Sequence, residues 1–249
     1  MSRKINWHIG CSGFYYKEWK EVFYPKGLAV SKWFGYYANH VNTLESNVSF
    51  YRFPSLSMLQ KWYRESAPGF SFTVKAPRSI THFKKFVECK SLLSDFYLVI
   101  REGLQEKLGC VLFQLPPSLG YSEERLQNII CQLDPSFTNI IEFRHPDWWR
   151  EDVYRMLAEK NITFCSQSHS KLPDTVICTS PFIYYRFHGT PELYRSAYSH
   201  EFLNRIVDET TRCENVKDVY LYFNNTMTTA AIEHVRYLQQ KLQVHFNDV

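Results

Sequence analysis

The stretch CVLFQLPPSLGYSEERLQNIICQLDPSFTNIIEFR, residues 110–144, contains two short apolar runs with an amphipathic run between them. Cys110–Leu115 and Asn139–Arg144 have the length and the branched and aromatic residues of buried strands. Ser122–Leu133 has apolar residues three and four apart and begins with a serine, as a capped helix does. A strand, a helix and a second strand in this order predict two parallel strands with a right-handed crossover.

The same alternation extends along the whole chain. The other predicted strands are Trp7–Cys11, Val41–Glu45, Phe70–Ala76, Ile162–Ser166, Phe182–His188 and Asp218–Phe223. The other predicted helices are Ser31–His40, Ser55–Ser66, Lys84–Lys107, Glu151–Lys160, Ser199–Cys213 and Thr226–Leu242. The stretch Ser168–Ser180 contains Pro173 and is expected to be a loop in place of the sixth helix. Eight such units in 249 residues predict an α/β fold, a TIM-type (β/α)8 barrel forming one domain over residues 1–249.

Composition and charge place few limits on function. The formal net charge of +4 is compatible with many kinds of partner. The seven cysteines include no CxxC motif, so we expect neither a zinc knuckle nor a disulfide framework. No apolar run is long enough for a membrane helix, and the first residues do not resemble a signal peptide. We therefore expect a cytoplasmic protein with no membrane partner, whose oligomeric state is open.

Alternation along the strands predicts where polar side chains gather. Neighbouring residues of a strand face opposite sides, so one set fills the barrel and the other packs on the helices. The predicted inward sets become polar at the C-terminal ends of the strands, where barrel enzymes carry their chemistry. The side chains expected to meet there are Ser12, Glu45, Lys75, Gln114, Glu142, Arg144, Arg186, His188 and Asn224.

Two structural explanations compete with this functional one. Strands end at the surface, where polar residues are common, and Glu142 with Arg144 can be a purely structural ion pair. The loop after the third strand adds Arg78 and His82, with two lysines close behind, and is either an anion-binding loop or a solvated basic loop. The loops also contain many aromatic residues, which can stack on bases or sugars but more often pack on neighbouring loops.

No P-loop, GxGxxG, HExxH or GxSxG motif is present. Glu45, Glu142, His82, His145 and His188 have side chains that suit Mn or Zn. However, their spacing is not that of a ligand set, and cations lie among them in the sequence. We therefore predict no cofactor, and a divalent metal remains an open alternative.

The chain resembles the DUF72 family, also called YecE-like proteins. The segments that carry the resemblance run in family order: Ile9-Gly-Cys-Ser-Gly-Phe14, Phe23-Tyr-Pro25, Thr43-Leu-Glu-Ser-Asn-Val-Ser-Phe-Tyr-Arg52, Val74-Lys-Ala-Pro77 with Thr81-His82, Leu112-Phe-Gln-Leu-Pro-Pro117, Glu142-Phe-Arg-His-Pro146 with Trp148, Tyr185-Arg-Phe-His-Gly189 and Tyr222-Phe-Asn-Asn225. The resemblance implies a TIM barrel and no activity, because the family has no assigned function. The chain departs from the family at Cys11 and at Ser166-Gln-Ser168, so an acid on the sixth strand is not expected here.

These residues support three hypotheses about function. In the first, a hydrolase or lyase acts on a phosphate-bearing or otherwise anionic substrate, a class that includes nucleic acids. Glu45, Glu142 and His188 would be its catalytic acids and bases. Its substrate-binding residues would be Ser12, Lys75, Arg78, His82, Gln114, Arg144, Arg186, Asn224 and Asn225. The second hypothesis is a metal-assisted isomerase or epimerase of a sugar or sugar phosphate. The third is a non-catalytic nucleic-acid-binding module.

Overall fold

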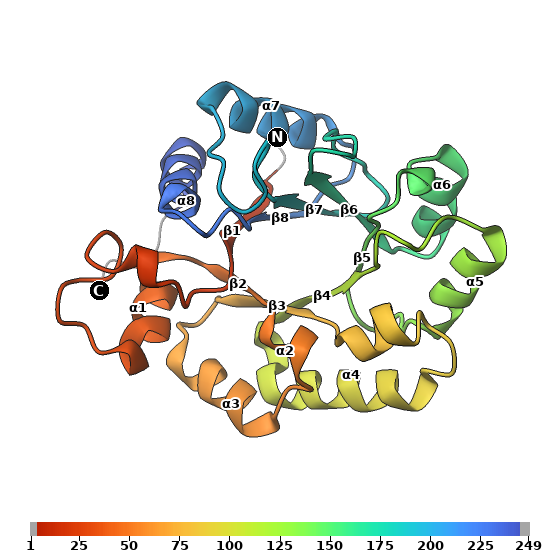
Figure 1. Cartoon of the computed structure of the whole chain (residues 1–249), viewed down its shortest axis with the longest axis horizontal. Helices are drawn as coiled ribbons and strands as arrows, with labels where there is room; N and C mark the ends of the chain where they lie inside the picture. Colours follow the sequence, from red (N-terminus) through yellow and green to blue (C-terminus); the bar gives the residue numbers. More distant parts are fainter. Residues whose placement is uncertain (1–3, 245–249) are drawn as a thin grey trace.

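A computed structural model of the protein describes residues 4–244. Its eight parallel strands close into a barrel in sequence order, and helices surround them (Figure 1). The strands are β1 (Asn6–Ser12), β2 (Thr43–Ser46), β3 (Ser71–Lys75), β4 (Leu108–Gln114), β5 (Asn139–Glu142), β6 (Thr163–Ser168), β7 (Phe182–Phe187) and β8 (Asp218–Phe223). The predicted TIM-type (β/α)8 barrel is therefore confirmed.

The helices are α1 (Trp33–His40), α2 (Val48–Tyr51), α3 (Leu56–Glu65), α4 (Lys90–Leu104), α5 (Glu123–Gln132), α6 (Glu151–Glu159), α7 (His200–Arg212) and α8 (Ala230–Leu242). Short 3-10 turns form at Lys17–Trp19, Val30–Lys32, Gln105–Lys107 and Pro146–Trp148. The predicted cap at Ser122 is confirmed, and Ser55 and Ser199 cap their helices in the same way. Their hydroxyl groups accept hydrogen bonds from the first turns of α5, α3 and α7. No helix forms between β6 and β7, as the sequence predicts.

The helix predicted from Lys84 begins later, and this prediction is wrong at its start. Ser79–Phe83 forms a π-helical turn instead. Lys85, Phe86 and Glu88 then have positive φ, which an α-helix cannot accommodate, so α4 begins at Lys90. The short helix α2, which follows β2 directly, was not predicted.

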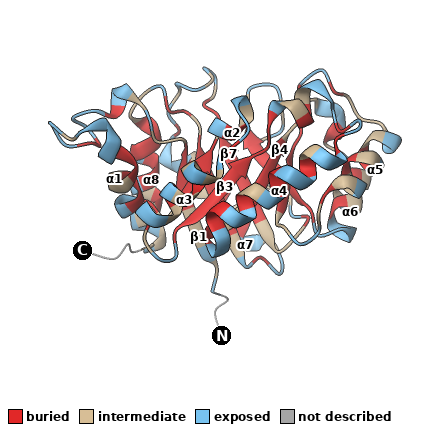
Figure 2. Ribbon diagram, turned by 90° about the horizontal axis from the view of Figure 1, so that it is seen from below, coloured by how far each residue is buried: buried red, intermediate tan, exposed pale blue. Residues whose placement is uncertain are grey.

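Two hydrophobic layers lie on opposite faces of the barrel wall. The inner cluster contains Cys110, Leu112, Ile140, Cys165, Tyr184, Tyr220 and Tyr222. The outer cluster contains the alternate residues of the same strands, such as Val111, Phe113 and Ile141, packed against the helices. Figure 2 shows the result as buried strands in the centre and exposed outer sides on the helices. The predicted alternation is therefore confirmed.

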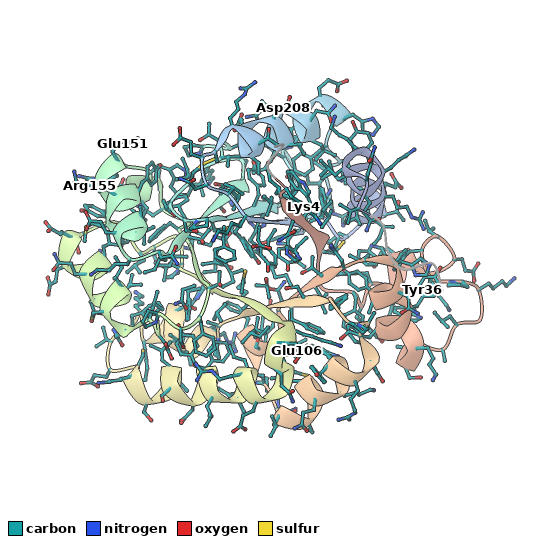
Figure 3. All side chains as sticks on the ribbon, turned by 180° about the vertical axis from the view of Figure 1, so that it is seen from behind. Lys4, Tyr36, Glu106, Glu151, Arg155 and Asp208 are labelled. Atoms are coloured by element: carbon teal, nitrogen blue, oxygen red, sulfur yellow. A yellow bond between two sulfur atoms is a disulfide. The ribbon has the colours of Figure 1, made fainter. Side chains whose placement is uncertain are left out.

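Charged side chains on the helices face away from this core. Glu151, Arg155 and Asp208 project from the outer helices in Figure 3. The charges near the ends of the strands differ from these because several of them are buried. Within residues 4–244, no helix is long and apolar enough to cross a membrane.

One expectation about the cysteines is wrong. Cys178, in the loop after β6, and Cys213, at the end of α7, form a disulfide with their Cα atoms 6.2 Å apart. The two residues are 35 positions apart, and only the folding of the β6–β7 loop onto α7 brings them together. The cytoplasmic location stays a prediction.

Candidate functional site

A cavity of about 140 Å³ opens at the C-terminal ends of the strands. Lys75 and Gln114 end β3 and β4, while Arg144 and Asn224 lie just past the ends of β5 and β8. The described lining contains no acidic side chain and consists of Asn47, Phe50, Tyr51, Lys75, Gln114, Arg144, Arg186, Tyr194 and Asn224. The walls thus combine three cations with neutral amides and aromatic rings.

Arg186 joins two buried carboxylates below this cavity. Its Nη2 donates to Glu45 Oε1 and its Nη1 donates to Glu142 Oε2, both at 2.6 Å. The hydroxyl group of Tyr184 donates to the other oxygen of Glu45, also at 2.6 Å. Both carboxylates have 0% exposure, so neither reaches the cavity directly. A buried charge of this kind is tolerated because it is paired and hydrogen-bonded.

Glu142 also holds the second arginine. Arg144 Nε lies 2.7 Å from Glu142 Oε1, an ion pair without a well-directed hydrogen bond. Burial alone would raise the pKa of Glu142, but Arg144 and Arg186 hold it well below its usual range. Glu142 is therefore ionised and offsets part of the positive charge beside the cavity.

His188 lies in the same buried network. Its Nε2 is 3.0 Å from Glu142 Oε1 and 2.9 Å from Arg144 Nη2, and its Nδ1 is 2.9 Å from the side-chain amide of Asn224. Burial, and then the nearby Arg144 and Arg186, hold the pKa of His188 well below its usual range. The ring is therefore neutral, with one nitrogen that donates and one that accepts. It contacts two residues that line the cavity, Arg144, which can only donate to it, and Asn224.

Lys75 is a side chain of the lining whose pKa is lowered toward neutral pH. Its Nζ donates to Gln114 Oε1 at 2.5 Å and lies 4.0 Å from the centre of the Phe50 ring. Its hydrogen-bond acceptor is thus a neutral amide and not a carboxylate. Burial first, and then the positive charge of Arg186, lower the pKa of Lys75 to about 7. This amine can therefore accept or release a proton near neutral pH.

The remaining predicted residues lie around the cavity and not in its described lining. His82 is half-buried against Phe50, and burial followed by Lys75 lowers its pKa to about 4. Arg78 is exposed at the rim. Asn225 is buried and donates to the backbone of Ser196, while Ser12 lines a neighbouring cavity.

Sequence reasoning missed Asn47 and Tyr184. Asn47 directly follows β2 and reaches the lining, while Tyr184 faces inward from β7 and packs in the inner cluster. The position of Asn47 just beyond a strand end was a signal that could have found it. The hydrogen bond from Tyr184 to Glu45 crosses the barrel between strands 139 residues apart, and no sequence signal indicates it.

Among residues 4–244, no three His, Cys, Asp or Glu side chains come together as a metal-binding group. The oxygens of Glu45 and Glu142 that a metal would need already accept from arginine or tyrosine.

The sequence is similar to two curated proteins that both carry the name UPF0759. The protein named UPF0759 protein YecE from Escherichia coli (strain K12) is 29% identical over 114 residues, which cover 45% of this chain and 42% of that protein. UPF0759 protein YunF from Bacillus subtilis (strain 168) is 26% identical over 149 residues, covering 54% of this chain and 50% of that protein. The matched stretches thus span about half or less of these relatives.

Solved structures match over a longer range. A DUF72 family protein from Thermotoga maritima is 29% identical with a TM-score of 0.85, and the match covers 96% of this chain and 100% of that chain. One from Enterococcus faecalis is 17% identical with a TM-score of 0.82, covering 97% of each chain, and supports the fold alone. The family model described as "Protein of unknown function DUF72" matches residues 8–249. The chain therefore belongs to the DUF72 family.

Proposed function

We propose that this protein is an enzyme, a hydrolase or lyase, that binds a small phosphate-bearing or carboxylate-bearing substrate in the cation-lined cavity. The observation that carries the proposal is the meeting of Lys75, Arg144 and Arg186 at one cavity whose described lining contains no acidic residue. Arginine and lysine in a partly dry site bind anions and stabilise the negative charge that develops during bond cleavage.

Lys75 is the group that we propose for proton transfer. It lines the cavity and has a pKa of about 7, close to the value that general acid–base catalysis at neutral pH requires. The neutral amine acts as a base above that pH, and the ammonium acts as an acid below it.

The predicted catalytic roles of Glu45, Glu142 and His188 stay proposals. Their contacts favour positioning, because the carboxylates fix Arg186 and Arg144 while the imidazole contacts Arg144 and Asn224. Each of these three side chains has 0% exposure and reaches a substrate only through the residues that it orients.

Ligand-dependent stability tests the proposal. Inorganic phosphate, small phosphate esters and small carboxylates are added to wild type, Lys75→Met and Arg144→Met, and Tm is measured. Ligand at 100 times Kd stabilises a protein by about 2.7 kcal/mol, or roughly 5–11 °C for a chain of this size. Wild type and the matched surface variant Arg150→Met should show the increase, and both cavity variants should lose it. Equal increases in all four proteins would contradict the proposal.

A second candidate, a nucleic-acid-binding module, is favoured by the rim of the cavity. The guanidinium of Arg78 lies 5.9 Å from the ring centre of Tyr51 and 5.2 Å from that of Phe83, and both rings are exposed. Such a cation with two aromatic faces suits a single-stranded backbone with stacked bases. Binding to a labelled oligonucleotide should then weaken steeply as salt is raised, and Arg78→Ala should flatten that dependence. Affinity that is insensitive to salt would remove this candidate.

A further inference from the structure

A second cavity, of about 250 Å³, adjoins the cation-lined one. The two share Asn47 and Tyr51 in their walls. We call the second cavity the aromatic slot, and it is lined by Ser12, Gly13, Phe14, Tyr15, Tyr16, Leu44, Ser46, Asn47, Val48, Tyr51 and Trp62. Together the two cavities reach the lower part of the ~300–1,000 Å³ range typical of small-ligand sites.

Two aromatic rings of the slot remain open to solvent. Tyr51 is 70% exposed and Tyr15 is 57% exposed, whereas Phe14 packs edge-on against buried Trp62 deeper in the wall. Other loop aromatics, such as Trp19, Trp148 and Tyr198, are buried among their neighbours, as the packing alternative predicts for them. Tyr15 contacts Trp33, and Tyr51 contacts Phe50 and Arg78, so each ring is only partly engaged within the chain. The exposed remainder of each ring is available to a ligand.

Polar atoms without partners lie in the same wall. Ser12 Oγ, Ser46 Oγ and Asn47 Oδ1 are buried and have no hydrogen-bond partner among the described residues. The serines themselves are 1% and 2% exposed. Buried polar atoms are nearly always hydrogen-bonded, so three exceptions at one cavity indicate a missing partner. An amide oxygen accepts and a hydroxyl group accepts or donates, so the partner must carry N–H or O–H groups.

We propose that the aromatic slot binds the heteroaromatic base of a nucleotide whose phosphate occupies the cation-lined cavity. This inference rests on the proposed function, because that cavity must take the anionic end. A planar base supplies both features that the slot requires, a ring for stacking on Tyr15 or Tyr51 and N–H groups for the three oxygens. A purely apolar group would stack but would leave Ser12, Ser46 and Asn47 without partners.

Calorimetric titration of the whole chain tests this inference. The probes are the four common ribonucleoside 5′-monophosphates, ribose 5-phosphate and phenyl phosphate. We expect at least one nucleotide to bind 10-fold or more tightly than both ribose 5-phosphate and phenyl phosphate. Val48 lines the slot at an exposed position, so Val48→Trp should fill the slot. This variant should lose the additional affinity for the nucleotide over ribose 5-phosphate, while its affinity for ribose 5-phosphate stays unchanged. Val22→Trp, at an exposed position outside the described lining of either cavity, is the matched control and should behave as wild type.

The possible outcomes separate the two proposals. If every phosphate binds equally in wild type, or if Val48→Trp retains the gain from the base, the slot is not a base site and the anion-binding proposal stands. If phenyl phosphate binds as tightly as every nucleotide, the slot binds an aromatic ring without hydrogen bonds to its N–H groups. The nucleotide assignment is then overturned. If no phosphate compound binds to wild type, the proposed function fails and this inference fails with it.

Discussion

Replacing Arg186 by methionine should destabilise the protein strongly. Methionine keeps much of the side-chain volume but removes the cation that joins Glu45 and Glu142. Glu142 keeps contacts with Arg144 and His188, whereas Glu45 keeps only its hydrogen bond from Tyr184 among the side-chain contacts that the structure describes. The variant therefore leaves a fully buried carboxylate without a cation.

The expected loss follows from that uncompensated charge. Removing one partner of a buried ion pair costs about 3–5 kcal/mol in the free energy of unfolding. Each kcal/mol lowers Tm by about 2–4 °C in a chain of this size, so the decrease should be roughly 6–20 °C. The double variant Arg186→Met with Glu45→Gln neutralises the orphaned carboxylate and should recover part of the loss.

Urea unfolding at pH 7, followed by circular dichroism, measures these differences. The matched control is Arg205→Met, which removes a guanidinium that is 39% exposed and paired with Asp174 and Glu209. Pairs of this kind contribute at most about 1 kcal/mol. A loss in Arg186→Met no greater than that of the control, with no recovery in the double variant, would refute the electrostatic reasoning.

Three further outcomes are expected. Burial disfavours the charged form of Lys75, whose pKa falls to about 7 in the folded protein. The folded state therefore binds fewer protons than the unfolded state between about pH 7 and the ordinary lysine pKa, and stability rises with pH across that window. Lys75→Met should remove this rise and be more stable than wild type by a few kcal/mol at pH 6. The free energy of unfolding of both proteins, measured from pH 6 to 10, tests this, and parallel curves of free energy against pH would contradict it. Gly10→Ala should lower the free energy of unfolding by about 1–3 kcal/mol, because a methyl group there meets the backbone of Thr43, while Gly35→Ala has open space in α1 and should be neutral or stabilising. Tyr184→Phe should cost about 1–3 kcal/mol in the same assay, because a buried carboxylate oxygen loses its donor; an unchanged midpoint would show that water replaces the hydroxyl group.

Much of the cavity could be predicted because strand alternation is a local property. Lys75, Gln114 and Arg186 each occupy the predicted inward set of their own strand, and closure of the barrel then brings them together. Arg144 lies two residues beyond the end of β5, and Asn224 lies one residue beyond the end of β8. Both continue the alternation of their strand, so they face the same side as its inward residues. No long-range information was needed for these assignments.

The electrostatic roles could not be predicted in this way. The sequence shows Glu45 and Glu142 as acids at strand ends and offers Arg144 as a local ion-pair partner of Glu142. Nothing local indicates that Arg186 and Tyr184 occupy the other carboxylate oxygens. The lowered pKa of Lys75 likewise depends on burial and on Arg186, which is 111 positions away in the sequence. Acid–base behaviour is set by distances between strands, and sequence spacing does not report those distances.

The amino-acid sequence by itself determined the number and order of strands, the face that each residue presents and the cationic character of the strand ends. These properties follow from backbone geometry and from hydrophobic periodicity over a few residues. The tertiary structure alone decided which charges neutralise each other, that Cys178 pairs with Cys213, and that an aromatic slot opens beside the cavity. Each of these depends on contacts between segments far apart in the chain, whose distances are fixed only when the barrel closes.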